Sequence, residues 1–207
     1  MMVVNIDPGT TYSAYVILKD GEIYKAGKVR NEELFLLINR LCRLSVKPVI
    51  VIEQVKAYSV TGDTTVWTVW WYGRFHERLV SAARTSIDIY YVPRSTVKSH
   101  VTGMTSKAKD KHVRMALIDR WGPQTYETDP EEQAKLPKAK RRKTEPGPTH
   151  LIKSDMWAAL AVGSWFIDQP KEELSQYTAE NLMETLRKKP RKKKKSTQTQ
   201  QQPAALR

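Results

Sequence analysis

The chain has 207 residues, with 35 Lys and Arg against 22 Asp and Glu, and so carries a net charge of +13. This length suits one domain with a full core and some appendages, and the positive charge favours a polyanionic partner, either nucleic acid or an anionic membrane. The single cysteine, Cys42, excludes an intramolecular disulfide and a cysteine-based zinc site.

The lengths of the apolar stretches indicate where in the cell the protein is expected. The longest strongly apolar stretch, residues 157–167, is far shorter than a membrane span, and no secretory signal segment opens the chain. Cys42 lies in a helical apolar pattern, so we expect it in the core of a protein from a reducing compartment. We expect a soluble intracellular protein in the cytoplasm; a nuclear or organellar location stays open.

The first stretch of the chain predicts two strands joined by a tight turn beside a carboxylate. Residues 3–6 form an apolar run that ends in Asp7, and residues 12–18 predict the return strand. Pro8 disfavours the helical region at Asp7, and Gly9 lets the chain reverse without a Cβ clash. Asp7 is therefore expected at a strand end, facing outward from the core. The alternative is an Asp that only caps the turn.

The rest of the chain predicts alternating strands and helices. Further strands are expected over residues 23–29, 49–53 and 87–92, and helices over residues 31–41, 66–83, 107–121 and 151–166. The pair Asp20-Gly21 predicts a hairpin turn, and Asn31 can cap the first helix. The β-branched run before Glu53 predicts a strand buried on both faces. The order predicts an α/β fold with a mixed five-stranded sheet, three antiparallel strands and then parallel ones, flanked by helices.

Composition divides the chain into one domain and polar appendages. Residues 1–170 are predicted to form the domain, with a basic, proline-rich insertion at about 122–149 that contains the basic cluster 138–143. Residues 171–186 predict a short acidic helical segment. Residues 187–207 are rich in Lys, Arg and Gln and bury too little apolar surface to offset the entropy of ordering, so a basic disordered tail is expected.

Three carboxylates recur in similar settings. Asp7 ends the first strand and Glu53 ends the fourth, and these strands can lie side by side in the sheet. Asp155 lies in the first turns of the last long helix. Carboxylates this close repel unless a cation lies between them, and hard oxygen ligands suit Mg²⁺ or Mn²⁺. Two such ions can activate water and stabilise the leaving oxygen of a phosphodiester. Each carboxylate alone also fits a structural role, as Asp155 does at a helix N-terminus.

Four segments resemble the RuvC family of Holliday-junction resolvases, in the RNase H-like superfamily. They are Ile6-Asp7-Pro8-Gly9-Thr10, Val51-Ile52-Glu53-Gln54-Val55, residues 93–113, and Asp155 with the Ala158-Ala159-Leu160-Ala161 that follows. The likeness covers roughly residues 2–168 and is that of a divergent member; a phage or viral origin is compatible with it. It implies an RNase H-like fold, a homodimer without a small-molecule cofactor, and a Mg²⁺-dependent endonuclease that resolves four-way DNA junctions by paired nicks in recombination, repair or replication.

The resemblance also implies roles for single residues. Asp7, Glu53 and Asp155 would be catalytic carboxylates that hold the metal ions. The position of the family's fourth metal ligand is Ile152, which cannot ligate, and His150 is the nearest substitute. A surface loop histidine is the alternative for His150.

Basic residues are expected to approach the DNA backbone near these carboxylates. Lys98 and Lys109 match basic residues of the family. Where the family often has an aromatic wedge, three residues after Glu53, this chain has Lys56, with Tyr58 two residues further on. The remaining expected DNA contacts are Arg94, Lys107 and Lys111. The aromatic helix over residues 66–83 is the expected dimer interface, with ordinary core packing as its alternative.

Other function classes stay open. Residues 7–11 also resemble the first phosphate loop of actin-like ATPases and sugar kinases, but the chain is short for two such lobes and lacks a second glycine-rich phosphate loop. ATP binding would distinguish that class. A second alternative is an RNase H-like protein that binds branched DNA without cutting it or that cuts RNA–DNA hybrids. A third is a broader nuclease that also cuts forks, flaps and Y-junctions; a substrate panel with metal would separate these.

Overall fold

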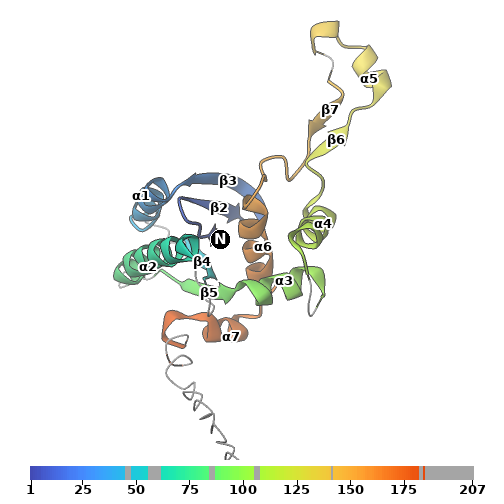
Figure 1. The fold of residues 1–207 in the computed structure, drawn as a ribbon. Helices are drawn as coiled ribbons and strands as arrows, with labels where there is room; N and C mark the ends of the chain where they lie inside the picture. Colours follow the sequence, from blue (N-terminus) through green and yellow to red (C-terminus); the bar gives the residue numbers. More distant parts are fainter. Residues whose placement is uncertain are drawn as a thin grey trace, which may run out of the picture.

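A mixed five-stranded sheet forms the centre of the protein. The computed structural model describes residues 1–44, 48–55, 62–83, 87–104, 108–140, 142–181 and 184. The strands are β1 (Met2–Asp7), β2 (Tyr12–Lys19), β3 (Glu22–Arg30), β4 (Val49–Gln54) and β5 (Ile89–Pro93), in the order β3-β2-β1-β4-β5 (Figure 1). β2 runs antiparallel to β1 and β3, whereas β4 runs parallel to β1 and β5. The predicted sheet is confirmed, including the neighbouring β1 and β4.

Helices cover both faces of this sheet. α1 (Asn31–Leu41) and α2 (Asp63–Ala83) pack on one face, where the buried core includes Cys42. α3 (Arg94–Thr102), α4 (Asp110–Trp121) and α6 (Met156–Ile167) pack on the other. α6 lies across β1 and β2 and is buried along most of its length, which matches its almost wholly apolar sequence. None of the helices in the described ranges has the length and apolar character needed to cross a membrane.

The pleat of the central strands decides where the strand-end carboxylates point. Successive side chains of a strand face opposite sides of the sheet. Val3 and Val51 belong to the core layer beneath α6, so Asp7 and Glu53, which are an even number of residues further on, project on that same side. The parallel register pairs Asn5 with Val51 and therefore brings the two carboxylates out side by side.

Several local features follow the sequence pattern and others differ. The Asp20-Gly21 turn has positive φ values of 52° and 87°, as a tight hairpin turn requires. Asn31 does not cap α1, because the N-cap position is Arg30 and the Asn31 side chain bonds instead to the turn after β1. The last long helix begins at Met156 rather than at residue 151, since turns occupy the preceding residues. α3 was not expected, because Val97 is its one buried residue and the apolar period is missing.

The insertion and the C-terminal segment are only partly described. Residues 122–149 form an arm that contains β6 (Thr125–Glu127), α5 (Pro130–Ala134), η1 (Lys138–Lys140) and β7 (Thr144–Pro146). After α6 come α7 (Lys171–Leu174) and η2 (Ser175–Tyr177), which form the start of the expected acidic segment. The expected tail at residues 187–207 lies outside the described residues, and the division into these parts stays a prediction.

Candidate active site

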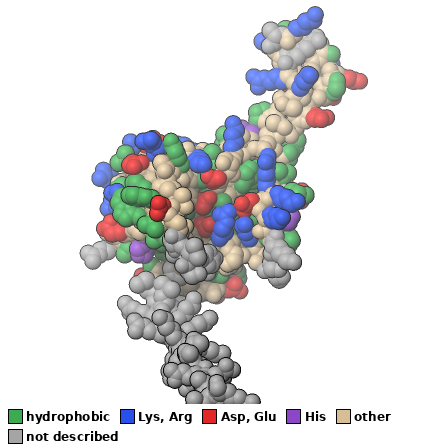
Figure 2. All heavy atoms as spheres, in the orientation of Figure 1, with side chains coloured by type: hydrophobic (Ala, Val, Ile, Leu, Met, Phe, Trp, Pro, Cys, Tyr) green, Lys and Arg blue, Asp and Glu red, His purple; other side chains and the backbone are tan. Residues whose placement is uncertain are grey.

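A cleft of about 200 Å³ opens on the α6 side of the sheet, at the carboxyl ends of β1 and β4. It receives all three carboxylates expected from the sequence, and with them a fourth, Asp110. The lining side chains are Asp7, Glu53, Arg94, Val97, Lys98, Asp110, Val113, Ser154, Asp155, Trp157, Ala158 and Ala161. Figure 2 shows acidic side chains gathered at the centre of this face with Lys and Arg side chains immediately beside them.

A network of buried polar groups shapes the turn that follows β1. The Nδ2 of Asn31 donates to the carbonyl oxygens of Gly9 and Thr10, at 3.0 and 3.1 Å. The Ser13 hydroxyl donates to Oδ1 of Asn31 at 2.6 Å and accepts from the Gly9 amide at 3.1 Å. A Cβ at Gly9 would lie 2.1 Å from a backbone oxygen, so this close approach requires glycine. The turn thereby holds Asp7 in the lining of the cleft.

The two strand-end carboxylates are largely removed from water. Burial raises the pKa of Asp7 to about 8, and the negative charge of Glu53 adds to the rise. Burial also raises the pKa of Glu53, which is 8% exposed, while Arg94 opposes that rise. Two desolvated carboxyl groups side by side favour any positive charge that can reach both. Such perturbed groups in a cleft are typical of functional sites.

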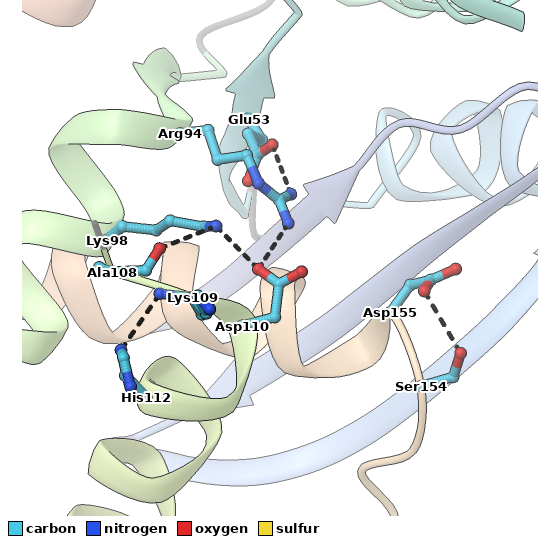
Figure 3. Close-up of polar contacts among 9 residues, drawn as sticks. All are labelled: Glu53, Arg94, Lys98, Ala108, Lys109, Asp110, His112, Ser154 and Asp155. Atoms are coloured by element: carbon cyan, nitrogen blue, oxygen red, sulfur yellow. Dashed lines mark hydrogen bonds and ion pairs between the residues drawn. The ribbon is translucent and has the colours of Figure 1, made fainter. Parts of the chain in front are cut away.

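Two cations from α3 neutralise part of this charge, as Figure 3 shows. The Nη1 of Arg94 donates to Oε1 of Glu53 at 3.0 Å, and its Nη2 donates to Oδ1 of Asp110 at 3.1 Å. The Nζ of Lys98 lies 2.8 Å from the same Asp110 oxygen, and it also donates to the Ala108 carbonyl at 3.4 Å. Lys98 and Arg94 lower the pKa of Asp110, chiefly through the hydrogen bond from Lys98. Asp110 therefore orients both cations toward the cleft.

Asp155 enters the cleft from the opposite side. It is the residue immediately before α6, where a negative charge is favourable, but its side chain does not cap the helix. Its Oδ2 lies 2.6 Å from Nζ of Lys28 on β3, and the Ser154 hydroxyl donates to its Oδ1 at 3.3 Å. Ser154 has a positive φ of 48°, which belongs to the turn that presents Asp155.

Sequence reasoning missed two of these partners. Asp110 is the first residue of α4 and directly follows Lys109 in the segment that resembles RuvC. That position is the signal in the sequence that would have indicated it. Lys28 lies on β3, and no pattern in the sequence links it to Asp155 across 127 residues, because that contact depends on α6 crossing the sheet.

The donors suit a hard divalent cation. Among the residues that the structure describes, no three His, Cys, Asp or Glu side chains are gathered closely enough to hold an ion. The cleft nevertheless combines four carboxylates with no sulfur or imidazole ligand, and two of the four are desolvated at adjacent strand ends. This donor chemistry fits Mg²⁺ or Mn²⁺.

The remaining expected site residues lie elsewhere. His150 is exposed, its Nδ1 lies 2.8 Å from the Gly147 carbonyl oxygen, and it does not line the cleft. Ile152 is fully buried in the core beneath α6, so that position offers no ligand. Lys109 and Lys111 are exposed at the start of α4, outside the cleft lining. The expected DNA contacts Lys56, Tyr58 and Lys107 lie outside the described residues.

Comparison with known proteins shows which solved structures share this fold. No protein-family model and no curated protein matches the chain. The solved structure of Thermus thermophilus RuvC in complex with a Holliday junction substrate covers 78% of this chain and 90% of its own, with 16% identity and a TM-score of 0.52. A second structure of Thermus thermophilus RuvC has the same identity and coverage and a TM-score of 0.50. The chain therefore has a RuvC-like fold with a divergent sequence, and the expected fold is confirmed.

Proposed function

We propose that this protein is a metal-dependent endonuclease that resolves four-way DNA junctions by paired nicks. One observation carries the proposal: Asp7, Glu53 and Asp155 line a single cleft at the carboxyl ends of parallel strands in a RuvC-like fold. The structural relative with the higher TM-score is a RuvC bound to a Holliday junction substrate. A crossover junction endodeoxyribonuclease is the enzyme class that fits this combination.

Asp7, Glu53 and Asp155 would hold the metal, Mg²⁺ or Mn²⁺, with two ions as the expected number. Bound there, the metal would activate water and neutralise charge at the scissile phosphodiester. The water oxygen would bond to phosphorus as the bond from phosphorus to the 3′ oxygen breaks, and a proton from the water would pass overall to that 3′ oxygen, which leaves a 5′-phosphate and a 3′-hydroxyl. Asp155 would exchange its contact with Lys28 for this role, which frees the Lys28 ammonium for the DNA backbone.

Arg94 and Lys98 would bind the phosphates that flank the cut. Both lie in the cleft, and Asp110 restrains them from the same side. Phosphate contacts of this kind set the register of a nuclease on DNA without reading its sequence. The exposed Lys109 and Lys111 extend the positive surface along α4, and Lys56, Tyr58 and Lys107 remain proposed DNA contacts.

Paired nicks call for two active sites, and α2 offers a surface for a second copy of the chain. Trp67 and Trp70 are 54% and 47% exposed on this helix, beside the exposed Val66 and Val69. An apolar group of this size on a helix surface is typical of an interface, and a symmetric dimer presents the same face twice. We propose that α2 pairs with its counterpart in a homodimer.

Cleavage of a labelled synthetic four-way junction, beside a Y-fork and linear duplex, tests the proposed function. The reactions contain Mg²⁺, Mn²⁺ or EDTA, and Asp7→Asn runs beside the control Asp119→Asn, which alters an exposed acid on α4. We expect symmetric nicks near the crossover that need the metal, and a loss of roughly a thousandfold in Asp7→Asn alone.

Other outcomes point to the alternatives. Tight junction binding without cleavage under either ion would contradict the enzymatic proposal and favour a branched-DNA-binding protein. Equal cleavage of forks and junctions would favour a broader structure-selective nuclease. Binding of ATP would favour the kinase-like class.

A further inference from the structure

The insertion forms an arm that leaves the domain near the cleft. β6 pairs antiparallel with β7, and α5 and η1 lie toward the far end of the arm (Figure 1). Every residue of both short strands is exposed, so the hairpin has no core of its own. A two-stranded hairpin without a hydrophobic face is only marginally stable in water. No described residue between 125 and 146 belongs to either core cluster, so we look for the role of the arm in what it contacts.

Hydrogen bonds hold the base of the arm against the domain. The Gly147 amide donates to the Gln124 carbonyl at 2.8 Å, which closes the two chains of the arm on each other. The Thr149 hydroxyl donates to the Gly122 carbonyl at 3.0 Å, and Arg114 of α4 donates to Oε1 of Gln124 at 2.8 Å. The chain then reaches Asp155 within a few residues. The base of the arm at residues 147–149 therefore leads directly into the turn that carries the proposed metal ligand Asp155.

Charge is divided unequally along this arm. The outgoing chain carries Glu127, Asp129 and Glu131, all exposed. The returning half carries most of the cations, and Figure 2 shows Lys and Arg side chains around the far end with acidic side chains toward one edge. In the described part of the arm, none of these cations forms an ion pair with an acidic side chain of the arm. The exposed cations are Lys135, Lys138, Lys140, Arg142 and Lys143.

We infer that this arm grips the phosphate backbone of one duplex arm of the branched DNA, outside the cleft. The inference rests on the proposed function for the kind of DNA in the cleft. Exposed, unpaired cations bind phosphates by releasing counterions, and such contacts give affinity and register but no sequence preference. The chain from Gln124 to Lys135 can span at most about 36–40 Å, which is roughly one turn of duplex DNA. The cations at the far end of the arm therefore reach phosphates only on a duplex of about that length.

Two variants remove the arm's contribution in different ways. In the first, Lys138, Lys140, Arg142 and Lys143 are all changed to Gln. In the second, residues 125–146 are deleted and Gln124 is joined to Gly147 through one glycine, a closure that their existing backbone hydrogen bond favours. The matched control changes Glu127, Glu131 and Asp129 to the neutral amides. Circular dichroism and thermal unfolding check that each variant folds.

The measurement is the dissociation constant for a four-way junction in EDTA, from about 50 to about 200 mM salt. Junctions with arms of about 20 base pairs are compared with junctions whose arms have about 5, which is half a helical turn. For long arms, we expect the four-site variant to bind about tenfold or more weakly and its salt slope to fall by roughly 3–4, near 0.9 per lost phosphate contact. For short arms, the loss should be clearly smaller in both arm variants, because Lys143 lies beside Thr128 near the base of the arm, whereas Lys138 and Lys140 lie further out. The control should bind at least as tightly as the parent.

Two results would overturn the inference. One is parental affinity and salt slope of both arm variants on long-armed junctions, which would point to a protein partner for the arm instead. The other is an equal loss of affinity on long-armed and short-armed junctions. It would mean that the cations act through general positive charge and not through contacts with the backbone of a duplex arm. Failure of the proposed function looks different: the parent would not cut junctions in Mg²⁺, while the dependence of binding on duplex length would persist.

Discussion

Arg94 of α3 donates a hydrogen bond from Nη1 to Oε1 of Glu53 at the end of β4, at 3.0 Å. The contact exists because β5 ends at Pro93 and α3 begins with the next residue, at the same sheet edge where β4 ends. Arg94 is thus the positive charge that balances a carboxylate removed from water. A divalent ion on Asp7 and Glu53 would supply the same neutralisation. It would compete with the Arg94 guanidinium for the Glu53 carboxylate.

Replacing Arg94 should make the protein depend more on divalent ions for stability. Without the guanidinium, the buried Glu53 carboxylate lacks its hydrogen-bonded cation, which costs stability. Because an ion bound only to the folded state restores that charge, Mg²⁺ should raise the melting temperature of Arg94→Gln by about 2–4 °C more than that of the parent. Thermal unfolding with MgCl₂ and with EDTA measures this. The control Arg120→Gln, which loses an ion pair with Asp168 away from the cleft, should respond like the parent; an equal response of Arg94→Gln would contradict the prediction.

The raised pKa of Asp7 predicts a falling stability with rising pH when divalent ions are absent. The folded protein keeps a proton on Asp7 up to about pH 8, whereas the unfolded chain releases it near the ordinary value of 3.8. The stabilisation is therefore complete below about pH 3.8 and is lost as the pH rises to about 8. Urea unfolding in EDTA across this range should show the loss in the parent. Asp7→Asn cannot ionise and should remove this component, leaving it more stable than the parent above pH 8. A parallel pH profile for the two proteins would show that Asp7 titrates normally.

An acid at position 152 should fail to supply a metal ligand. Ile152 is fully buried in the core beneath α6, so Ile152→Asp places an unpaired carboxylate in an apolar layer. We expect a loss of about 3 kcal/mol or more in the free energy of unfolding. The conservative Ile152→Val should lose only about 0.5–1.5 kcal/mol. Denaturant unfolding compares the two; parental stability of Ile152→Asp together with tighter Mg²⁺ binding would instead place this residue at the site.

Removing the Asn31 side chain should disturb the site through the turn after β1. Asn31→Ala deletes the donor to Gly9 and Thr10 and leaves their partly buried carbonyls without it. The expected cost is about 1–3 kcal/mol in the free energy of unfolding. Junction cleavage should fall further than stability explains, because Asp7 precedes this turn. The control Glu32→Ala changes an exposed residue one position further along α1 and should leave both quantities unchanged. Parental cleavage by a folded Asn31→Ala would contradict this role.

Local patterns in the sequence predicted the elements of the sheet because their causes are local. Alternating or continuous apolar runs set the strands, and the Asp20-Gly21 pair set the hairpin turn through its positive φ values. α3 escaped prediction because helices without an apolar period are held by neighbouring elements and by the strand that precedes them. The short motifs around Asp7 and Glu53 also indicated the RuvC-like fold.

Residue pattern alone predicts the strands of the mixed sheet, and the order of elements along the chain allows the strands that end in Asp7 and Glu53 to be neighbours, as they are. Which other charges meet these two carboxylates depends on how distant parts of the chain pack together. Asp110 joins the cleft and His150 does not, and Asp155 meets Lys28, because these contacts depend on how α4, α6 and β3 cross one another. Coulomb energy and desolvation act through space between residues far apart in the chain, and no local pattern encodes that distance.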